Sequence, residues 1–283
     1  MTETVNIPVP VEDKVAPRPR PGRWAAYAAI VLVVALLLES VLTNANWRWH
    51  IVAEYLFDIN VLRGLGITVL LTAASILCGL LLGSAIAGLR LSQSRFLSGF
   101  ASWYIWFFRG VPVIVQVIFF VYLAQLYPVL SLGIPFGPAF VHFDTNILIS
   151  PIVGCIIGLT LNESAYMAEI IRGAVASVPR GQREAAAALG MTPWQMRRRV
   201  LAPQLLPIAL PPFFNNVISM TKTTAVVILA SVTDLFSAVS QIAARNFQQV
   251  PLLLVATFWY LALTAVITML QILIERLITR HTR

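Results

Sequence analysis

The residues best suited to chemistry are polar side chains set inside long apolar runs. Glu163 follows Asn162 near the middle of one run, and Lys222 precedes Thr223 near the middle of another. A charged group at the centre of a membrane helix costs about 2.5–3.5 kcal/mol on insertion scales, so such groups normally face protein or water. We expect Glu163 and Lys222 either to form a structural ion pair or to line a path for a polar solute.

Spacings typical of catalytic and metal sites are missing from the sequence. The three histidines lie far apart, and neither cysteine belongs to a Cys-x-x-Cys pair. A phosphate-binding P-loop needs a glycine directly before its lysine, but Lys14 follows Asp13 and Lys222 follows Thr221. We therefore expect no metal, no directly bound cofactor and no enzymatic activity in this chain.

The overall composition explains why so few charges are available. Of the 283 residues, 58% are hydrophobic and 11% are charged, whereas an ordinary globular chain carries about 25% charged residues. The mean hydropathy is +0.81. These values exclude a soluble domain, a disordered chain and a disulfide-rich scaffold, and they predict an integral membrane protein.

Apolar runs long enough to cross a bilayer, which takes about 20 residues, occur six times. We expect an all-α, polytopic bundle of about six transmembrane helices. Two pairs of small residues, Gly79 with Gly83 and Gly154 with Gly158, are spaced to let helices of the same subunit approach closely. The six predicted spans are Trp24–Thr43, Ile67–Leu89, Trp103–Tyr127, Ile147–Ile171, Ile208–Ala230 and Leu252–Ile274.

The direction of the spans follows from the excess of Lys and Arg in cytoplasmic loops. With the N-terminus inside, sixteen of these residues fall on the cytoplasmic side and Lys222 lies within a span. Only Arg48, Arg63 and Arg245 then fall outside. Both termini are therefore predicted to be cytoplasmic.

The cytoplasmic segment 172–207 is too organised for a simple linker. We expect a short helix over Glu184–Leu189, with Glu184 in its first turn, where negative charge suits the helix dipole. Gly190 is placed to end that helix in a left-handed conformation. Thr192 has capping-box spacing for a second helix, which Pro203 is expected to close.

A helix, a glycine turn and a second helix could be surface decoration without a binding role, or they could have one of two binding roles. One is a DNA-binding helix-turn-helix, with Arg197–Arg199 on phosphates. The other is a docking element for a cytoplasmic protein. Because both ends of the segment are attached to the bilayer, we expect protein docking and no nucleic acid, with Arg197–Arg199 facing lipid headgroups.

The docking segment carries a recognisable pattern. Glu184-Ala185-Ala186, followed after three further residues by Gly190 and then by Val200-x-Ala202-Pro203, resemble the EAA loop of ATP-binding-cassette (ABC) importer permeases. The usual ending of that loop is Ile-x-Leu-Pro, so Val200 and Ala202 are conservative departures.

Further motifs resemble the branch of these permeases for polar amino acids of the His, Glu, Gln, Arg and opine type. Phe108-Arg109-Gly110-Val111-Pro112 is similar to its Arg-Gly-x-Pro segment. The run Tyr166–Gly173 resembles the approach to the loop, and its Glu169 and Arg172 have the spacing of a local ion pair. Asn216 and Lys222-Thr223-Thr224 resemble the following span. The resemblance covers about residues 60–275.

The resemblance implies a type I ABC importer permease fold in a bacterial cell membrane. Expected partners are the lipid bilayer, a second permease subunit, cytoplasmic ABC ATPase subunits that use the ATP, and an extracytoplasmic solute-binding protein. The residues implied for ATPase coupling are Glu184, Ala185, Ala186, Gly190 and Pro203. Those implied for the motif framework are Arg109, Gly110, Pro112, Glu169 and Arg172.

For the substrate path we expect Asn162, Glu163, Lys222 and Thr223. A zwitterionic amino acid would offer a carboxylate to Lys222 and an ammonium group to Glu163. The alternative function is an ion-coupled secondary amino-acid transporter that works without an ATPase. It predicts repeated halves, which the sequence does not show.

The expected domain organisation has four parts. A disordered cytoplasmic tail covers residues 1–23, and the first transmembrane helix with its outer loop covers residues 24–66. The permease transmembrane domain covers residues 67–275 and includes the coupling loop, 172–207. A short cytoplasmic tail follows over residues 276–283.

Overall fold

The computed structural model describes residues 21–134 and 138–281, in two units, Met1–Arg48 and Trp49–Arg283. The first unit holds the helix α1 (Pro21–Thr43) and a 3-10 turn, η1 (Ala45–Trp47). Nearly all α1 side chains from residue 25 onward are exposed. Of the predicted tail, residues 1–20 lie outside the described residues, and 21–23 begin α1.

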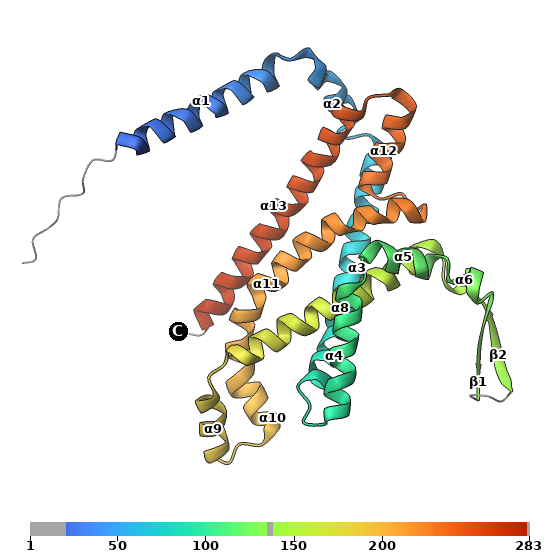
Figure 1. Cartoon of the computed structure of the whole chain (residues 1–283), viewed down its shortest axis with the longest axis vertical. Helices are drawn as coiled ribbons and strands as arrows, with labels where there is room; N and C mark the ends of the chain where they lie inside the picture. The colour runs from blue at the N-terminus through green and yellow to red at the C-terminus, as the bar shows by residue number, and fades with distance from the viewer. Residues whose placement is uncertain (1–20, 135–137, 282–283) are drawn as a thin grey trace, which may run out of the picture. The chain divides into compact units, whose positions relative to one another are not determined.

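The second unit is built almost entirely of helices (Figure 1). Its one described sheet is a two-stranded antiparallel hairpin. The elements in chain order are α2 (Trp49–Tyr55), α3 (Ile59–Arg90), α4 (Arg95–Gly110), α5 (Val113–Val121), α6 (Leu123–Leu126), β1 (Val129–Gly133), β2 (Ala139–Asp144), α7 (Thr145–Leu148), α8 (Pro151–Ser177), α9 (Arg180–Ala188), α10 (Pro193–Met196), the π-helical turn η2 (Arg197–Leu201), α11 (Ala202–Thr223), the 3-10 segment η3 (Thr224–Ala230), α12 (Leu235–Asn246) and α13 (Gln249–His281).

The predicted all-α membrane bundle is confirmed, but the count of six spans is only approximate. Within the described residues, four helices are long and apolar enough to cross a membrane, or five if the bent pair α4–α5 is one span. That pair is bent by 95°, so the predicted third span, Trp103–Tyr127, is wrong as a straight helix. The four helices are Ala25–Thr43, Ile59–Arg90, Pro193–Ala230 and Gln249–Ile278.

Helix α8 is long enough to span a bilayer but is less apolar than these four, because Asn162 and Glu163 interrupt it. It lies at the centre of the second unit, between α3 and α5 (Figure 1). Its surroundings are therefore mostly protein, and this is where a polar stretch in a membrane helix is tolerated.

The two glycine pairs are confirmed as contacts within the subunit. A Cβ atom at Gly83 of α3 would lie 2.6 Å from the Ser164 carbonyl oxygen of α8, and one at Gly79 would lie 2.5 Å from Cγ of Glu163. On the other side of α8, a Cβ at Gly158 would lie 2.7 Å from Cα of Val117 in α5. The absent side chains thus let α8 pack directly on two neighbours.

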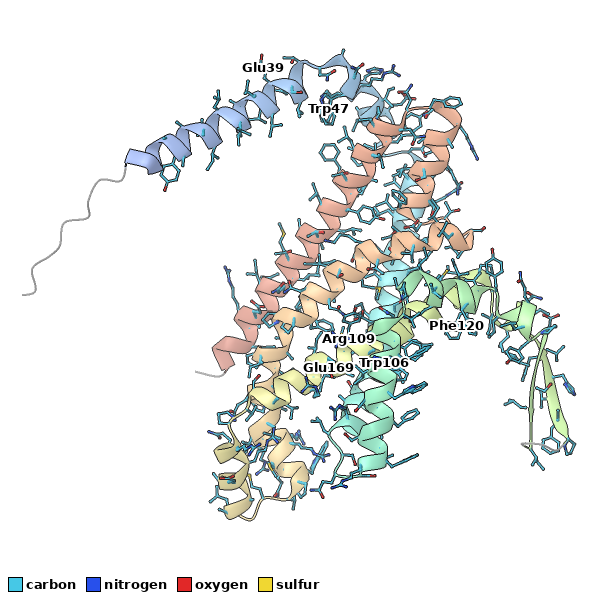
Figure 2. All side chains as sticks on the ribbon, viewed as in Figure 1. Glu39, Trp47, Trp106, Arg109, Phe120 and Glu169 are labelled. Carbon is cyan, nitrogen blue, oxygen red and sulfur yellow. The ribbon has the colours of Figure 1, made fainter. Side chains whose placement is uncertain are left out.

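Apolar packing fixes the remaining helices around this centre. One buried cluster joins α3, α5, α8 and η3 through residues such as Leu71, Val117 and Leu159. A second joins α2, α3, α12 and α13 at the other end of α3. Exposed aromatic side chains cover the outside, as at Trp106 of α4, which is 70% exposed (Figure 2). An exposed surface of this kind suits a lipid environment.

The β-hairpin and the full length of the last helix are not among the features that the sequence predicts. Strands β1 and β2 pair from Val129 with Asp144 to Gly133 with Ala139, and the hairpin projects from the helices beyond α6 (Figure 1). Helix α13 continues to His281, so residues 276–281, set apart as a tail, belong to it.

Candidate functional site

The bend between α4 and α5 is held open by side chains from two helices. Gln116 of α5 donates from Nε2 to the carbonyl oxygens of Phe108 (2.9 Å) and Val111 (2.8 Å). Asn162 of α8 donates from Nδ2 to the same Phe108 oxygen at 2.8 Å. Irregular backbone at membrane depth is tolerated only when it is buried in protein or lines a cavity, and these bonds replace the helical ones lost around Pro112.

A cavity of about 330 Å³ opens beside this bend, between the α4–α5 corner, α8 and α11. The sequence-predicted residues Asn162, Glu163 and Thr223 line it, as do Arg109, Gly110 and Pro112 of the Arg-Gly-x-Pro segment. The structure therefore joins two groups of residues to which the sequence analysis gave different roles. The other lining residues are Val111, Val113, Tyr166, Asn216, Ser219 and Met220.

Glu163 is the acidic group of this cavity. Its side chain is 1% exposed, and its Oε1 accepts a short hydrogen bond from Nδ2 of Asn216 in α11. This bond connects α8 to α11 across 53 positions of sequence. A buried carboxylate next to a cavity can bind a cationic group that enters it, since burial strengthens the attraction between opposite charges.

Arg109 is the basic group of the cavity and comes from the last turn of α4. Its guanidinium lies 5.1 Å from the ring centroid of Tyr166 in α8, a cation–π contact. Figure 2 shows Arg109 where α4 ends. The predicted orientation places Arg109 on the cytoplasmic side, although its position falls within the predicted third span.

Glu169 and Arg172 form the local ion pair that their spacing predicts. Arg172 donates from Nε and Nη2 to the two carboxylate oxygens of Glu169, both at 2.9 Å. This bidentate pair lies on α8 and does not line the cavity. The pair thus belongs to the helix framework next to the site.

The predicted ion pair between Glu163 and Lys222 does not form. Lys222 is exposed on α11, is not among the residues that line the cavity, and makes no ion pair with Glu163. Its neighbour Thr223 does line the cavity, because successive residues of a helix point about 100° apart. The depth of a residue in the membrane therefore does not tell whether Lys222 or Thr223 faces the cavity.

The coupling segment begins with α9, which is longer than predicted. It starts at Arg180 behind Pro179, so Glu184 is exposed in its middle and not in its first turn. Ala185 is also exposed, while Ala186 is buried, 3% exposed. Arg183 donates from Nη2 to the Val175 carbonyl at 2.7 Å and ties α9 to the end of α8.

The end of α9 has the geometry that Gly190 predicts. Gly190 has φ +69°, in the left-handed region. The Met191 N–H donates to the Ala186 carbonyl (3.1 Å) and the Gly190 N–H donates to the Ala187 carbonyl (2.9 Å). This is the pair of bonds of a Schellman motif, and it makes a stiff turn between the two helices.

The second helix begins as predicted but does not end at Pro203. Thr192 and Gln195 form a complete capping box, with Pro193 in the first turn. The helix then continues through the π-helical turn η2 into α11, and Pro203 lies in the first turn of α11. Within η2 the Ala202 N–H donates five residues back, to the Arg197 carbonyl. This altered pattern accommodates the proline ring that a regular helix would exclude.

Two residues of the coupling segment escaped the sequence analysis. Leu189 is 75% exposed and Trp194 is 69% exposed, on either side of the Gly190 turn. Large apolar side chains that are exposed on a polar segment indicate a protein contact. The signal was available, because both residues stand in a charged, alanine-rich stretch that has no core to enter.

The coupling segment is joined directly to the helices that line the cavity. Helix α9 follows α8, which carries Glu163, and α10 continues into α11, which carries Asn216. Displacement of the α9–α10 unit therefore acts on the two helices that the Glu163–Asn216 bond connects. In the residues the structure describes, no group of His, Cys, Asp or Glu could hold a metal ion.

Comparisons with known proteins agree with this arrangement. Residues 75–280 match the family described as "Binding-protein-dependent transport system inner membrane component". The chain is 40% identical to the arginine transport system permease protein ArgU of Corynebacterium glutamicum, over 95% of this chain and 83% of that protein. It is 32% identical to the L-cystine transport system permease protein TcyB of Bacillus subtilis, over 82% of this chain and 92% of that protein.

Among solved structures, the chain resembles one described as an amino acid ABC transporter with histidines. The TM-score is 0.63 at 30% sequence identity, and the match covers 77% of this chain and 93% of that one.

Proposed function

The chain belongs to the family of binding-protein-dependent transport system inner membrane components, and from this premise we propose that it is the ABC importer permease subunit through which a polar amino acid crosses the membrane. Relatives at 40% and 32% identity carry names of arginine and cystine permeases. Both substrates are polar amino acids, which supports that substrate class for this chain.

The observation that carries the proposal is the central cavity, where Arg109 and Glu163 line one space. A zwitterionic amino acid has one carboxylate and one ammonium group. We assign the carboxylate to Arg109, in place of Lys222, and the ammonium group to Glu163. The hydroxyl and amide groups of Asn162, Asn216, Ser219 and Thr223 then suit a polar side chain.

The mechanism follows from the continuity of the helices. ATP is used by separate cytoplasmic ATPase subunits, which bind the α9–α10 unit through Leu189 and Trp194. Because α8 and α11 lead directly out of this unit, closure of the ATPases changes their separation. The Glu163–Asn216 bond and the cavity beside it would then rearrange, so that the substrate site opens alternately to either side. Such transitions need stiff elements, and the capped α9–α10 unit is one.

Further partners complete the proposed importer. A second permease subunit, identical or different, would form the path together with this chain, and an extracytoplasmic solute-binding protein would deliver the substrate. An ion-coupled transporter working alone is not favoured, because the exposed α9–α10 unit would then have no partner.

The proposal is tested by uptake of a panel of labelled amino acids into proteoliposomes that contain the complete complex. We expect uptake of at least one polar amino acid that requires ATP inside and the solute-binding protein outside. R109Q and E163Q should each reduce uptake by about 100-fold, because each removes one of the two charges that we assign to binding the zwitterionic substrate. K222Q, a matched removal of charge outside the cavity, should retain it. Uptake without any ATPase would contradict the proposal.

A further inference from the structure

A second polar cavity lies at the other end of α3, apart from the central one. It has a volume of about 430 Å³ and opens between the first turns of α3 and the helix α12. Arg63 and Arg245 line it together with the amides of Asn60 and Gln241. It shares no lining residue with the central cavity, so it is a separate site.

The wall of this cavity is a tight contact between α3 and α12. A Cβ atom at Gly64 would lie 2.6 Å from the Asp234 carbonyl oxygen, so only glycine allows this approach. Thr68 of α3 accepts from the Leu235 N–H at 3.1 Å. These contacts hold Arg63 and Arg245 on the two walls of one cavity.

Among the residues that the structure describes, no carboxylate lines this cavity. Asp234 takes part in the contact between α3 and α12, but it is fully buried and its Oδ1 accepts from the N–H (2.9 Å) and the hydroxyl (2.6 Å) of Ser237. Arg63 and Arg245 are exposed, and neither belongs to an ion pair among the described residues. The cavity therefore presents two guanidinium groups and two amide groups without an internal anion.

The distribution of Lys and Arg between the two sides of the membrane makes the presence of two arginines in this cavity unusual. In the predicted orientation only three Lys or Arg residues lie on the outer side of the membrane, and two of them line this one cavity. Because basic residues are depleted on the outer side, their meeting in one cavity indicates a function. Anionic lipids attract basic residues mainly at the cytoplasmic leaflet, which argues against a lipid headgroup as the ligand.

We propose that this outer cavity binds an acidic side chain of the solute-binding protein and so docks that protein on the permease; this inference rests on the proposed function. Guanidinium groups bind carboxylates in a bidentate geometry, and the amides of Asn60 and Gln241 can donate to the same group. An aspartate or glutamate on the surface of the binding protein is the complementary partner.

The test uses the full complex in nanodiscs and the solute-binding protein that stimulates its ATP hydrolysis. In the variant R63Q/R245Q, the concentration of binding protein giving half-maximal stimulation should rise by about tenfold or more, with the maximal rate unchanged. Because surface charge pairs are screened by salt, added NaCl should raise that concentration for the original complex and have much less effect on the variant. R63K/R245K should recover most of the affinity.

Two controls keep the outcomes distinct. Basal ATP hydrolysis reports whether the variant complex is folded, and R95Q, which removes an exposed arginine at the start of α4, should change nothing. An unchanged half-maximal concentration with unchanged salt dependence overturns the docking site. A reduced maximal rate at unchanged affinity also overturns it, because the cavity then acts on the substrate. If no binding protein stimulates the original complex, the proposed function itself fails.

Discussion

The α9–α10 unit and the central cavity lie on the same helices but are stabilised in opposite ways. The turn between α9 and α10 is held by bonds between residues at most five positions apart, as in the Thr192–Gln195 box and the Gly190 turn. The cavity depends in addition on bonds that join residues more than fifty positions apart, as from Asn162 to Phe108 and from Asn216 to Glu163. The first region can therefore move as a rigid piece, while the second changes whenever its helices shift.

The largest effect is expected from a substitution that pushes apart the helices around the cavity. G158L places a large side chain where a Cβ alone would lie 2.7 Å from the Val117 backbone. Overpacking of this kind costs about 1–3 kcal/mol or more, and here the clash is with backbone. We expect loss of most of the folded complex, measured by size-exclusion chromatography and thermal unfolding.

G173L is the matched control on the same helix, because a Cβ at Gly173 has no neighbour within 4 Å. It should leave the yield and melting temperature nearly unchanged. Equal loss in both variants would show that the contact between α8 and α5 does not hold the cavity region together.

The next largest effect should come from the exposed surface of the coupling unit. L189D/W194D places charges where we expect apolar anchors for the ATPase. The loss of a buried apolar anchor from an interface typically weakens the binding free energy by about 2 kcal/mol or more. We expect ATPase co-purification to fall by about tenfold or more, while substrate binding to the permease persists.

The control for this surface is R198Q, which removes a charge from the same segment and leaves Leu189 and Trp194 in place. It should retain the ATPase. If L189D/W194D retained it equally well, the ATPase would have to bind elsewhere on the cytoplasmic side.

A smaller effect is expected from the donor that holds the α4–α5 bend. Q116L removes the bonds to the Phe108 and Val111 carbonyls. An unsatisfied buried polar group costs about 1–3 kcal/mol, so the melting temperature should fall by several degrees and substrate affinity should weaken. Q125L, at an exposed position of α6, should do neither. A stable Q116L variant with normal affinity would show that the bend does not depend on this side chain.

The smallest effect should come from the coupling unit's own cap. T192A removes the side-chain acceptor of the capping box, which is worth about 1 kcal/mol. We expect a modest drop in the number of substrate molecules carried per ATP hydrolysed, with substrate affinity unchanged. A changed affinity instead would mean that the two regions are less independent than their hydrogen bonds indicate.

The same contrast explains what the sequence could predict. Caps and turns depend on neighbouring residues, so Gly190, Thr192 and Gln195 could be interpreted without a fold. The end of the second helix was mispredicted because a proline normally breaks a helix, and the π-helical turn that accommodates Pro203 has no simple sequence signal. The EAA-type pattern indicated the family, and the apolar composition predicted the membrane bundle.

The cavity could be predicted only in part, because its residues meet through tertiary packing. Glu163 and Asn162 were found as polar residues in an apolar run. Arg109 lies at the end of a helix whose 95° bend the apolar run concealed, so Lys222 was chosen as the basic group in its place. The hairpin β1–β2 likewise lies in a stretch without a strong local pattern.

The most direct test of the account is equilibrium binding of a transported, labelled amino acid to the permease–ATPase complex, in competition with two analogues. One analogue lacks the carboxylate and the other lacks the α-ammonium group. The original complex should bind each analogue about tenfold or more weakly. R109Q should lose discrimination only against the first analogue, and E163Q only against the second. The account is contradicted if both variants discriminate like the original complex.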